Sequence, residues 1–382
     1  MQKRIPLSVP NLKGNELKYV SQAIEEEWVS TAGQFIVDFE EKMSKYVGVP
    51  SAVACQSGTA GLHLALQVCG VLQGDLVIVP TLTFVAAVNP VRYLGAEPIF
   101  MDCDDSLTMD AEKLQEFCET QCELIDDILT HRETGKYVRA IVVVHVFGNM
   151  ADMEAIIRIA NRFHLKVVED ATEALGTYYT SGMYSGKFAG TIGDIGVYSF
   201  NGNKIITTGG GGMIVSNNLR CLDECKHLST QAKSDMVYFD HDEVGYNYRM
   251  TNVQAAIGLA QLEQLEDFIA IKKRNYEMYR GQGIPLLDFR QDIRSNYWFY
   301  SYITEDRDEC LVYLDERMIQ TRPIWKLIHT LKPYENNIAY RIEKATWYYE
   351  RVLNLPCSSN LLEEDVMRVS KIIVERNHTS SR

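Results

Sequence analysis

Hydrophobic residues in this chain fall into two alternating patterns. Short, continuous apolar runs such as DLVIVP (75–80) and RAIVVVHV (139–146) are typical of strands that are buried on both faces. Between such runs lie segments with helical spacing, for example MADMEAIIRIANRFH (150–164). Strands that alternate with helices of this length indicate βαβ units. The pattern therefore predicts an α/β fold with a mostly parallel sheet covered on both faces.

The two ends of the chain depart from this alternation. Before the first strand, helices are expected over 14–28 and 35–46. A long amphipathic helix is expected over 251–279, and the segments beyond it are shorter and less regular. We therefore predict a large domain over residues 1–260 and a smaller domain over residues 261–382.

Two segments raise more specific expectations. The first expected helix carries Leu17, Val20, Ile24 and Trp28 on one apolar stripe. The polar segment 119–137 interrupts a βαβ unit, and we expect a helix followed by a surface loop there.

Composition narrows the possible partners. A formal net charge of −13 argues against nucleic acid as the main partner, because that role needs a basic surface. No apolar run approaches the length of a membrane span, and the first residues lack a signal-peptide core. The nine cysteines include no CxxC pair, which predicts reduced thiols in the cytoplasm rather than disulfides or a metal site. An anionic small-molecule substrate would need cations placed at its own site.

The first signal of chemistry is SGTAGLHLAL, which begins where the predicted strand SAVACQ ends. A helix that starts at Ser57, Gly58 and Thr59 presents free backbone N–H groups and the positive end of its dipole. That arrangement suits a phosphate group, although an ordinary capped helix has the same pattern. The stretch is not a nucleotide P-loop, because the GxxxxGK[ST] spacing is absent.

The second signal is VVEDATEALG, in which Asp170 ends a predicted strand. In open α/β sheets, ligands bind beyond the carboxyl ends of the strands. A carboxylate there is costly to desolvate unless it has a cationic partner or strong hydrogen bonds. Two interpretations of Asp170 stay open: a helix N-cap, or a counter-charge for a protonated ring nitrogen.

The third signal is SFNGNKIITTGGGG (199–212), in which Lys204 follows another predicted strand by a few residues. A lysine at the rim of a cleft is usually a solvated surface charge. A partly desolvated lysine, however, loses its proton more readily and can form a Schiff base. We interpret the glycines at 209–212 as backbone that passes close to a neighbour, and not as the phosphate cradle.

The three signals fit one another. A phosphate cradle, an acid for a ring nitrogen and a lysine about 35 residues later are the protein groups that pyridoxal 5′-phosphate (PLP) requires. Each signal is weak alone, whereas the ordered set predicts PLP as the cofactor.

With these residues identified, the chain resembles the DegT/DnrJ/EryC1/StrS family of sugar aminotransferases, almost from end to end. The resemblance implies the aspartate-aminotransferase fold (PLP fold type I). That fold has a large domain with a mostly parallel seven-stranded sheet and a smaller C-terminal α+β domain. The motifs that carry the resemblance are WVSTAGQFIVDFE, SGTAGLHLAL, PTLTFVAAVNP, VVEDATEALG, GDIGVYSFNGNKIITTGGGGMI, GYNYRMTNVQAAIGLAQL and TRPIWKLIH.

The resemblance implies roles for individual residues. Lys204 would bind the cofactor covalently and act as general base and acid, and Asp170 would keep the pyridine nitrogen protonated. Gly58, Thr59 and Ser199 would bind the phosphate.

Three further residues would complete the cofactor site. Phe84 would stack on the ring; without the resemblance it would be interpreted as a core residue. Many family members have glutamine where this chain has Glu173, a position that contacts the ring oxygen. A carboxylate there would repel the oxygen unless one of them is protonated, or unless Glu173 points elsewhere. Asn247 would reach the cofactor phosphate of a second subunit, which implies a homodimer with shared active sites.

The substrate expected from the resemblance is a nucleotide-linked keto sugar, with L-glutamate as amino donor. NGNKIITTGGGG and TRPIWKLIH suggest the LegC/PglE-like branch, which aminates C4 of UDP-linked 2-acetamido-4-keto-6-deoxy sugars. A 3-keto sugar, or a GDP- or dTDP-linked sugar, is the alternative. The residues expected to contact the substrate are Thr31, Arg249, Arg322, Lys326 and His329.

Two other classes of protein share this fold. In related sugar dehydratases, histidine replaces the lysine, so Lys204 argues against dehydration. A regulator built on the same domain would need an added DNA-binding module, and the acidic charge is unsuitable for one.

Overall fold

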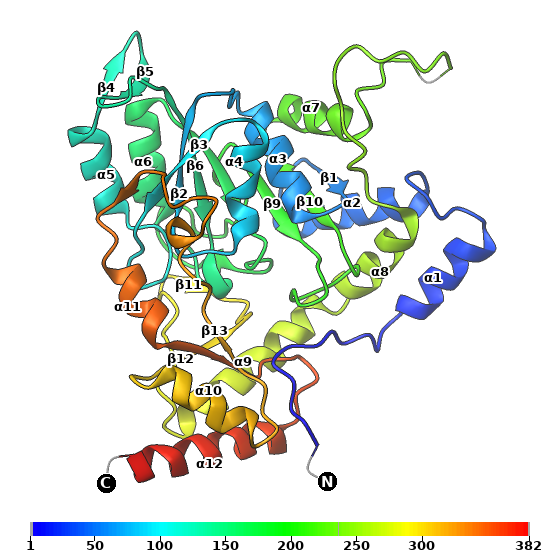
Figure 1. Ribbon diagram of the computed structural model, residues 1–382. Coiled ribbons are helices and arrows are strands. Elements are labelled where there is room, and N and C mark those ends of the chain that lie inside the picture. The colour runs from blue at the N-terminus through cyan, green and yellow to red at the C-terminus, as the bar shows by residue number, and fades with distance from the viewer. Residues whose placement is uncertain (1–2, 236, 381–382) are drawn as a thin grey trace.

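The computed structural model describes residues 3–235 and 237–380, and its centre is an eight-stranded sheet (Figure 1). One strand, β10, runs opposite to the other strands of the sheet, so the predicted mostly parallel sheet is confirmed. The expected seven strands are joined by an eighth, because the two-residue β14 pairs with β3. In spatial order the strands are β1 (Ser51–Cys55), β10 (Gly212–Ser216), β9 (Ile195–Ser199), β7 (Lys166–Asp170), β6 (Val138–Val144), β2 (Leu76–Pro80), β3 (Glu97–Met101) and β14 (Ala339–Tyr340).

The continuous apolar runs are explained by two cores, one on each face of this sheet. Successive side chains of a strand point to opposite faces. In β2, Val77 and Val79 join one core, whereas Leu76 and Ile78 join the other. Both faces of the strand therefore need apolar side chains.

Helices cover both cores. α3 contributes Leu62 and Leu64 to one core, and α2 and α6 contribute residues such as Phe39 and Ile156 to the other. Asp152 begins α6 by accepting a hydrogen bond from the backbone of Ala155. The helices of this part are α1 (Glu16–Glu25), α2 (Gln34–Val47), α3 (Gly58–Val68), α4 (Asn89–Tyr93), α5 (Ala111–Thr120), α6 (Met153–Phe163), α7 (Leu219–Ser229) and α8 (Asn252–Leu262), with short 3₁₀ turns at Val85–Ala87 and Val146–Gly148.

The C-terminal part lies below the sheet in Figure 1, where both ends of the chain are also found. Its own sheet has three antiparallel strands in the order β12–β15–β13. Its elements are α9 (Leu265–Gly281), β11 (Ile293–Arg294), β12 (Tyr300–Ile303), α10 (Arg307–Asp315), β13 (Arg322–Pro323), a 3₁₀ turn (Ile328–Thr330), α11 (Lys344–Arg351), β15 (Val352–Leu355) and α12 (Glu363–Ser380); β11 pairs with β8 (Tyr178–Tyr179).

The single helix expected over 251–279 is wrong. The structure has two helices, and Thr251 starts the first of them with a capping box that includes Gln254. That helix ends at Leu262 and α9 starts at Leu265, so the chain breaks helical hydrogen bonding close to the predicted domain boundary. The division into two domains itself stays a prediction.

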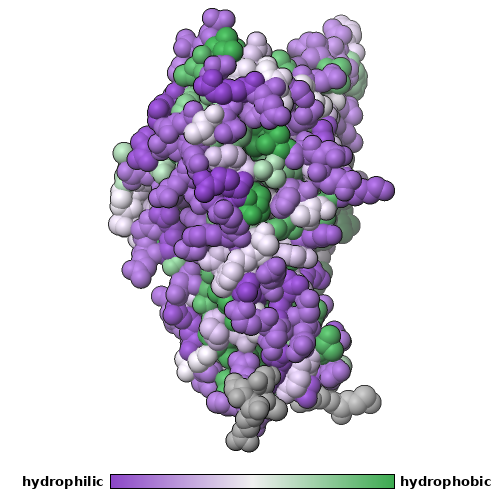
Figure 2. All heavy atoms as spheres, turned by 60° about the vertical axis from the view of Figure 1, so that its left-hand side comes forward, coloured by the Kyte–Doolittle hydropathy of each residue, from purple (hydrophilic) through white to green (hydrophobic). Residues whose placement is uncertain are grey.

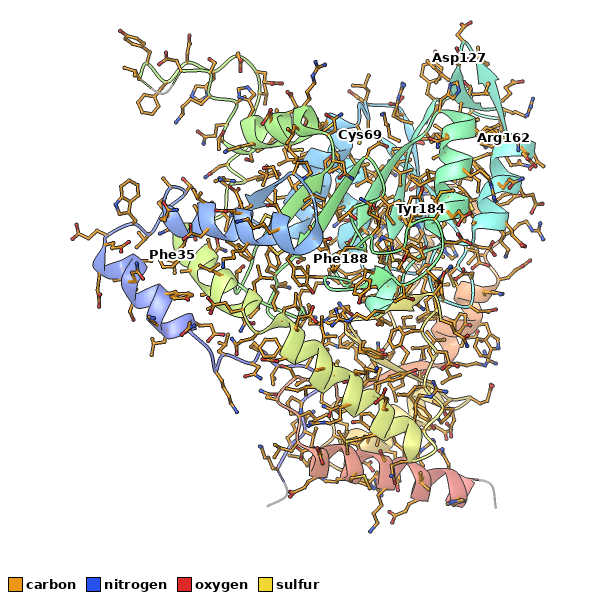
Figure 3. All side chains as sticks on the ribbon, turned by 180° about the vertical axis from the view of Figure 1, so that it is seen from behind. Phe35, Cys69, Asp127, Arg162, Tyr184 and Phe188 are labelled. Atoms are coloured by element: carbon orange, nitrogen blue, oxygen red, sulfur yellow. The ribbon has the colours of Figure 1, made fainter. Side chains whose placement is uncertain are left out.

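The loop expected in segment 119–137 is also wrong. After α5 the chain forms a hairpin of β4 (Cys122–Ile125) and β5 (Ile128–His131). Asp126 and Asp127 connect the strands, and both have positive φ, as the two central residues of a type I′ turn do. Figure 3 shows Asp127 at the projecting tip of this hairpin.

The stripe expected on the first helix is mostly exposed in the described part of the subunit. Val20 packs against a core, and Trp28 lies beyond the end of the helix at Glu25. Leu17 is 80% exposed, Ile24 57% and Trp28 56%. The helix packs through Tyr19, whose ring centroid lies 5.6 Å from that of Phe35 at the start of α2 (Figure 3).

The face in Figure 2 is mainly hydrophilic, with small hydrophobic patches. Among the described residues, no helix is both long enough and apolar enough to cross a membrane.

Candidate active site

Three strands bring the candidate residues to one edge of the sheet. Cys55 at the end of β1, Gly212 at the start of β10 and Ser199 at the end of β9 are paired in register. Asp170 ends β7 opposite Val197 of β9. The SGT turn, Asp170 and the Lys204 loop therefore meet at one edge, as the rule for open α/β sheets requires.

A cavity of about 600 Å³ opens at this edge. Both the large sheet and the C-terminal part contribute to its walls. The sequence-predicted residues that line it are Gly58, Thr59, Phe84, Asp170, Glu173, Ser199, Lys204 and Arg322.

The SGT turn forms a closely packed cradle. Ser57 caps α3 by accepting a hydrogen bond from the backbone N–H of Ala60 (3.1 Å). A Cβ atom at Gly58 would lie 2.9 Å from Cβ of Ser199, and one at Gly212 would lie 2.7 Å from the Ser57 carbonyl. Glycine at both positions lets the helix start lie directly against β9 and β10. This supports the interpretation of Gly212 as close backbone packing.

Asp170 is a buried acid, 4% exposed. One carboxylate oxygen accepts the backbone N–H of Thr172 at 3.0 Å. Within residues 3–235 and 237–380, no cationic group lies within 4 Å of it. Burial raises the pKa of Asp170, and the positive charge of Lys204 opposes that rise. The N-cap interpretation is wrong, because turns and not a helix follow Asp170. The counter-charge interpretation stays a prediction, and it is compatible with the position of Asp170 on the cavity wall.

Lys204 is held in the cavity and is not a surface charge. Its side chain is only 12% exposed, and Nζ lies 3.6 Å from Oε1 of Glu173. Nζ also lies 4.3 Å from the ring centroid of Trp298. The indole N–H of Trp298 donates to the carbonyl of Asn203 at 2.8 Å, so the same residue fixes the loop and covers the amine.

The loop that carries Lys204 is tied at its base. The backbone N–H of Phe200 donates to Gly211, and that of Thr208 donates to Phe200, both at 2.9 Å. Gly209 has a φ of 80°, a conformation that favours glycine.

Glu173 is 3% exposed and uses both carboxylate oxygens. Oε1 faces Lys204, and Oε2 accepts the backbone N–H of Phe147 at 3.0 Å. Phe147 has the left-handed φ of 57°, which is unfavourable for a bulky residue. Burial raises the pKa of Glu173 to about 7, although Lys204 lowers it. Glu173 therefore titrates near neutral pH.

Aromatic side chains close the cavity. Phe84 is 53% exposed, and its ring centroid lies 6.4 Å from that of Trp325. The rings of Phe147 and Trp325 are 4.7 Å apart. Sequence reasoning missed Trp298 and Trp325; their clustering with other aromatic residues in NYWFY and RPIW was the available signal.

The remaining predicted residues do not line this cavity. The guanidinium of Arg249 is bound to Glu40 at 2.5 Å and to the carbonyl of Ala54 at 3.0 Å. The Nδ1 atom of His329 is hydrogen-bonded to Thr81 at 2.6 Å. The structure exposes Thr31, Asn247 and Lys326 elsewhere. Roles for these five residues toward a substrate or a second subunit stay predictions.

These residues fit the protein side of a PLP site. Free N–H groups at the start of α3 suit a phosphate, buried Asp170 suits a protonated ring nitrogen, and Lys204 supplies the amine. The fold and the site together define a PLP-dependent enzyme of fold type I.

Comparisons with known proteins lead to the same class of enzyme. The model of the "DegT/DnrJ/EryC1/StrS aminotransferase family" matches residues 10–374. The chain is 39% identical to the GDP-perosamine synthase of Escherichia coli O157:H7, with 98% of each chain covered. It is 37% identical to the GDP-perosamine synthase of Caulobacter vibrioides, with 96% of each covered.

Solved structures give the same assignment. A DegT DnrJ EryC1 StrS aminotransferase from Brucella abortus superposes with a TM-score of 0.87 at 27% identity, covering 94% of this chain and 95% of that one. The aminotransferase TlmJ from Streptoalloteichus hindustanus also has a TM-score of 0.87, at 26% identity, with 97% and 98% covered. The chain belongs to the DegT/DnrJ/EryC1/StrS aminotransferase family. It is a PLP-dependent sugar aminotransferase.

Proposed function

We propose that the protein transfers the amino group of L-glutamate to C4 of a nucleotide-linked 4-keto-6-deoxy sugar. The observation that supports the proposal most directly is the placement of Lys204. Its amine lies inside the cavity, 3.6 Å from Glu173 and beside Trp298. An amine in this position can act on a substrate that enters from the open side.

Each residue would contribute a distinct function. The start of α3 and Ser199 would bind the cofactor phosphate, and Asp170 would keep the ring nitrogen protonated. When bound, PLP supplies the electron sink that makes a proton on the neighbouring carbon removable. Lys204 would carry that proton as general base and then as general acid, first for glutamate and then for the sugar. Because one lysine serves both half-reactions, the kinetics would be ping-pong.

The relatives favour a GDP-linked substrate. Three relatives, each at least 35% identical, are named GDP-perosamine synthase. The UDP-linked 2-acetamido sugar expected from the LegC/PglE-like motifs is therefore the second candidate. Arg322 is the cation best placed for an anionic substrate, because it lines the cavity and no ion pair engages it among the described residues.

A panel of substrates tests the proposal. The purified enzyme with PLP and L-glutamate would be given GDP-, UDP- and dTDP-linked 4-keto-6-deoxy sugars and a 3-keto sugar. We expect 2-oxoglutarate and an amino sugar product with the GDP-linked 4-keto sugar. Product from the UDP-linked sugar alone would support the second candidate. No amino sugar from any member would contradict the proposed activity.

We further propose that the enzyme is a homodimer with shared active sites. The exposed stripe of Leu17, Ile24 and Trp28 supports this, because large apolar patches on a surface mark interaction sites. Asn247 lies outside its own cavity, where it is free to serve a second subunit. All nine cysteines are free thiols, which fits the expected cytoplasmic location.

A further inference from the structure

Glu173 lines the cavity beside Lys204, and its carboxylate is in an unusual environment. Its carboxylate is almost fully buried and yet has a single cation, Lys204, within 4 Å among the described residues. A glutamine at this position could not exchange a proton with a lysine, whereas a carboxylate can.

We propose that Glu173 and Lys204 form a proton-sharing pair, in which Glu173 is the immediate acceptor and donor of the proton that Lys204 exchanges. The inference rests on the proposed function, because it assigns a partner to the lysine of that same site.

Geometry carries the proposal. Oε2 of Glu173 is fixed by the Phe147 N–H, so Oε1 is left facing Nζ of Lys204. The 3.6 Å gap is slightly longer than a hydrogen bond, and a small side-chain movement closes it. Phe147 adopts its unfavourable backbone conformation where its N–H meets this carboxylate. Such strain is found where a functional group must be held in place.

The surroundings leave the pair little exposed, with 12% of the Lys204 side chain and 3% of the Glu173 side chain accessible. Trp298 is 2% exposed and covers Lys204, and the backbone N–H of Phe147 is hydrogen-bonded to Oε2 of Glu173. The charged groups that face Glu173 are Lys204 and Asp170, which have opposite effects on its ionisation. His145, which follows the neighbouring strand β6, lowers the pKa of Asp170.

The proton transfer is balanced without any other reactant. The N–H bond of the Lys204 ammonium breaks, and an O–H bond forms at Oε1 of Glu173. A neutral amine and a neutral carboxylic acid replace the ion pair, and the lone pair of Nζ becomes available. The reverse step returns the proton. With a pKa raised to about 7, the carboxyl of Glu173 can both accept and release a proton under physiological conditions.

The test uses the full-length chain without cofactor and difference infrared spectroscopy. The spectrum of wild type minus E173Q isolates the carboxyl group of Glu173. We expect the band of the protonated carboxyl at about pH 6 and its loss by about pH 8. E173Q keeps the shape of the side chain and an oxygen for the Phe147 N–H, so its fold should be preserved.

If Glu173 and Lys204 interact, the charge of each residue must shift the midpoint pH of the other by a similar amount. Lys204→Met removes the positive charge, and the midpoint of the Glu173 band should rise by about one pH unit or more. In E173Q, amine-reactive labelling of Lys204, followed by mass spectrometry, should have its midpoint at lower pH by a similar amount. Glu41→Gln, at an exposed position on α2, is the control and should change neither midpoint.

Two results would overturn the proposal: a Glu173 carboxyl that stays ionised down to about pH 5, or identical midpoints in wild type and Lys204→Met. The second result would mean that the carboxyl of Glu173 does not sense the charge of Lys204, so the two could not act as a pair. If no sugar of the substrate panel is aminated but the midpoints of Glu173 and Lys204 still depend on each other, the proposed function is wrong and the proton-sharing pair is supported. If a keto sugar is aminated but the midpoints of Glu173 and Lys204 do not depend on each other, the pair is wrong and the proposed function is supported.

Discussion

At the residue scale, replacement of Lys204 by arginine tests whether the site needs the primary amine of Lys204 or only its positive charge. Lys204→Arg keeps a cation beside Glu173 but removes the primary amine, and the guanidinium cannot lose its proton. After incubation with PLP and removal of the free cofactor by gel filtration, we expect no visible absorbance on the protein. We also expect a fall in turnover on the order of 10³-fold or more. Absorbance spectra and glutamate-dependent formation of 2-oxoglutarate measure the two effects. A variant with full turnover would exclude Lys204 as the catalytic amine.

Gly58 tests the close packing of the cradle. In Gly58→Ala the new Cβ would meet Ser199 at 2.9 Å and Thr172 at 3.1 Å, so the start of α3 must shift. We expect PLP affinity to fall about tenfold, since overpacking costs about 1–3 kcal/mol. Fluorescence titration with PLP measures this. Gly281→Ala is the control, because nothing lies within 4 Å of its added Cβ; equal affinities in both variants would contradict the argument.

The positions of some site residues could be predicted from the sequence, whereas those of others could not. Lys204 and Asp170 follow strands of the sheet, and strand ends are predictable from apolar runs. Trp298 lies about 95 residues from the loop it covers, and only the packing of the C-terminal part on the sheet brings it there. The pairing of Arg249 with Glu40 depends in the same way on two distant segments.

At the scale of elements, Asp102 attaches α11 to the large sheet. It accepts backbone N–H groups of Glu343, Lys344 and Ala345 and binds the ammonium of Lys113 at 2.6 Å. Burial favours the neutral form of Asp102, but Lys113 and the backbone N–H groups outweigh it and lower the pKa.

Asp102→Ala should therefore reduce the free energy of unfolding by about 2–4 kcal/mol at neutral pH, because three N–H groups and a lysine lose their acceptor. The contribution of a carboxylate with a lowered pKa is present above its unfolded pKa of about 4 and is lost as the pH falls through the folded value. Urea unfolding at several pH values measures both effects. Glu343→Gln, at the exposed partner of Lys113, should change little; an Asp102→Ala cost that does not shrink in acid would contradict the argument.

The two wrong element predictions share a physical cause. The hairpin at 122–131 turns on Asp126 and Asp127, which lack the glycine that usually signals such a turn. The break between α8 and α9 at Glu263 and Gln264 has no proline or glycine. In both cases the sequence therefore lacks the glycine or proline that usually signals such a change of direction.

At the scale of the whole molecule, the proposed homodimer with shared active sites predicts complementation between two inactive variants. Lys204→Arg would inactivate a subunit's own site, whereas Asn247→Asp would repel the phosphate in the other subunit's site. Mixed and refolded together, the two variants should regain about a quarter of wild-type turnover, because half of the dimers have one intact site. Each variant alone should stay nearly inactive. If the mixture is no more active than its components, the sites are not shared.

Two segments of the C-terminal part pair with the backbone of earlier segments, and this pairing has a consequence for biosynthesis. Strand β14 completes the sheet beside β3, and the backbone of Ile5 pairs with Ile319. A nascent chain that has emerged only as far as α8 therefore carries an unpaired sheet edge and an N-terminal segment without its partner. Open edges are prone to association with other chains. The final third of the chain must leave the ribosome before this edge is protected, so chaperone demand should peak late in translation.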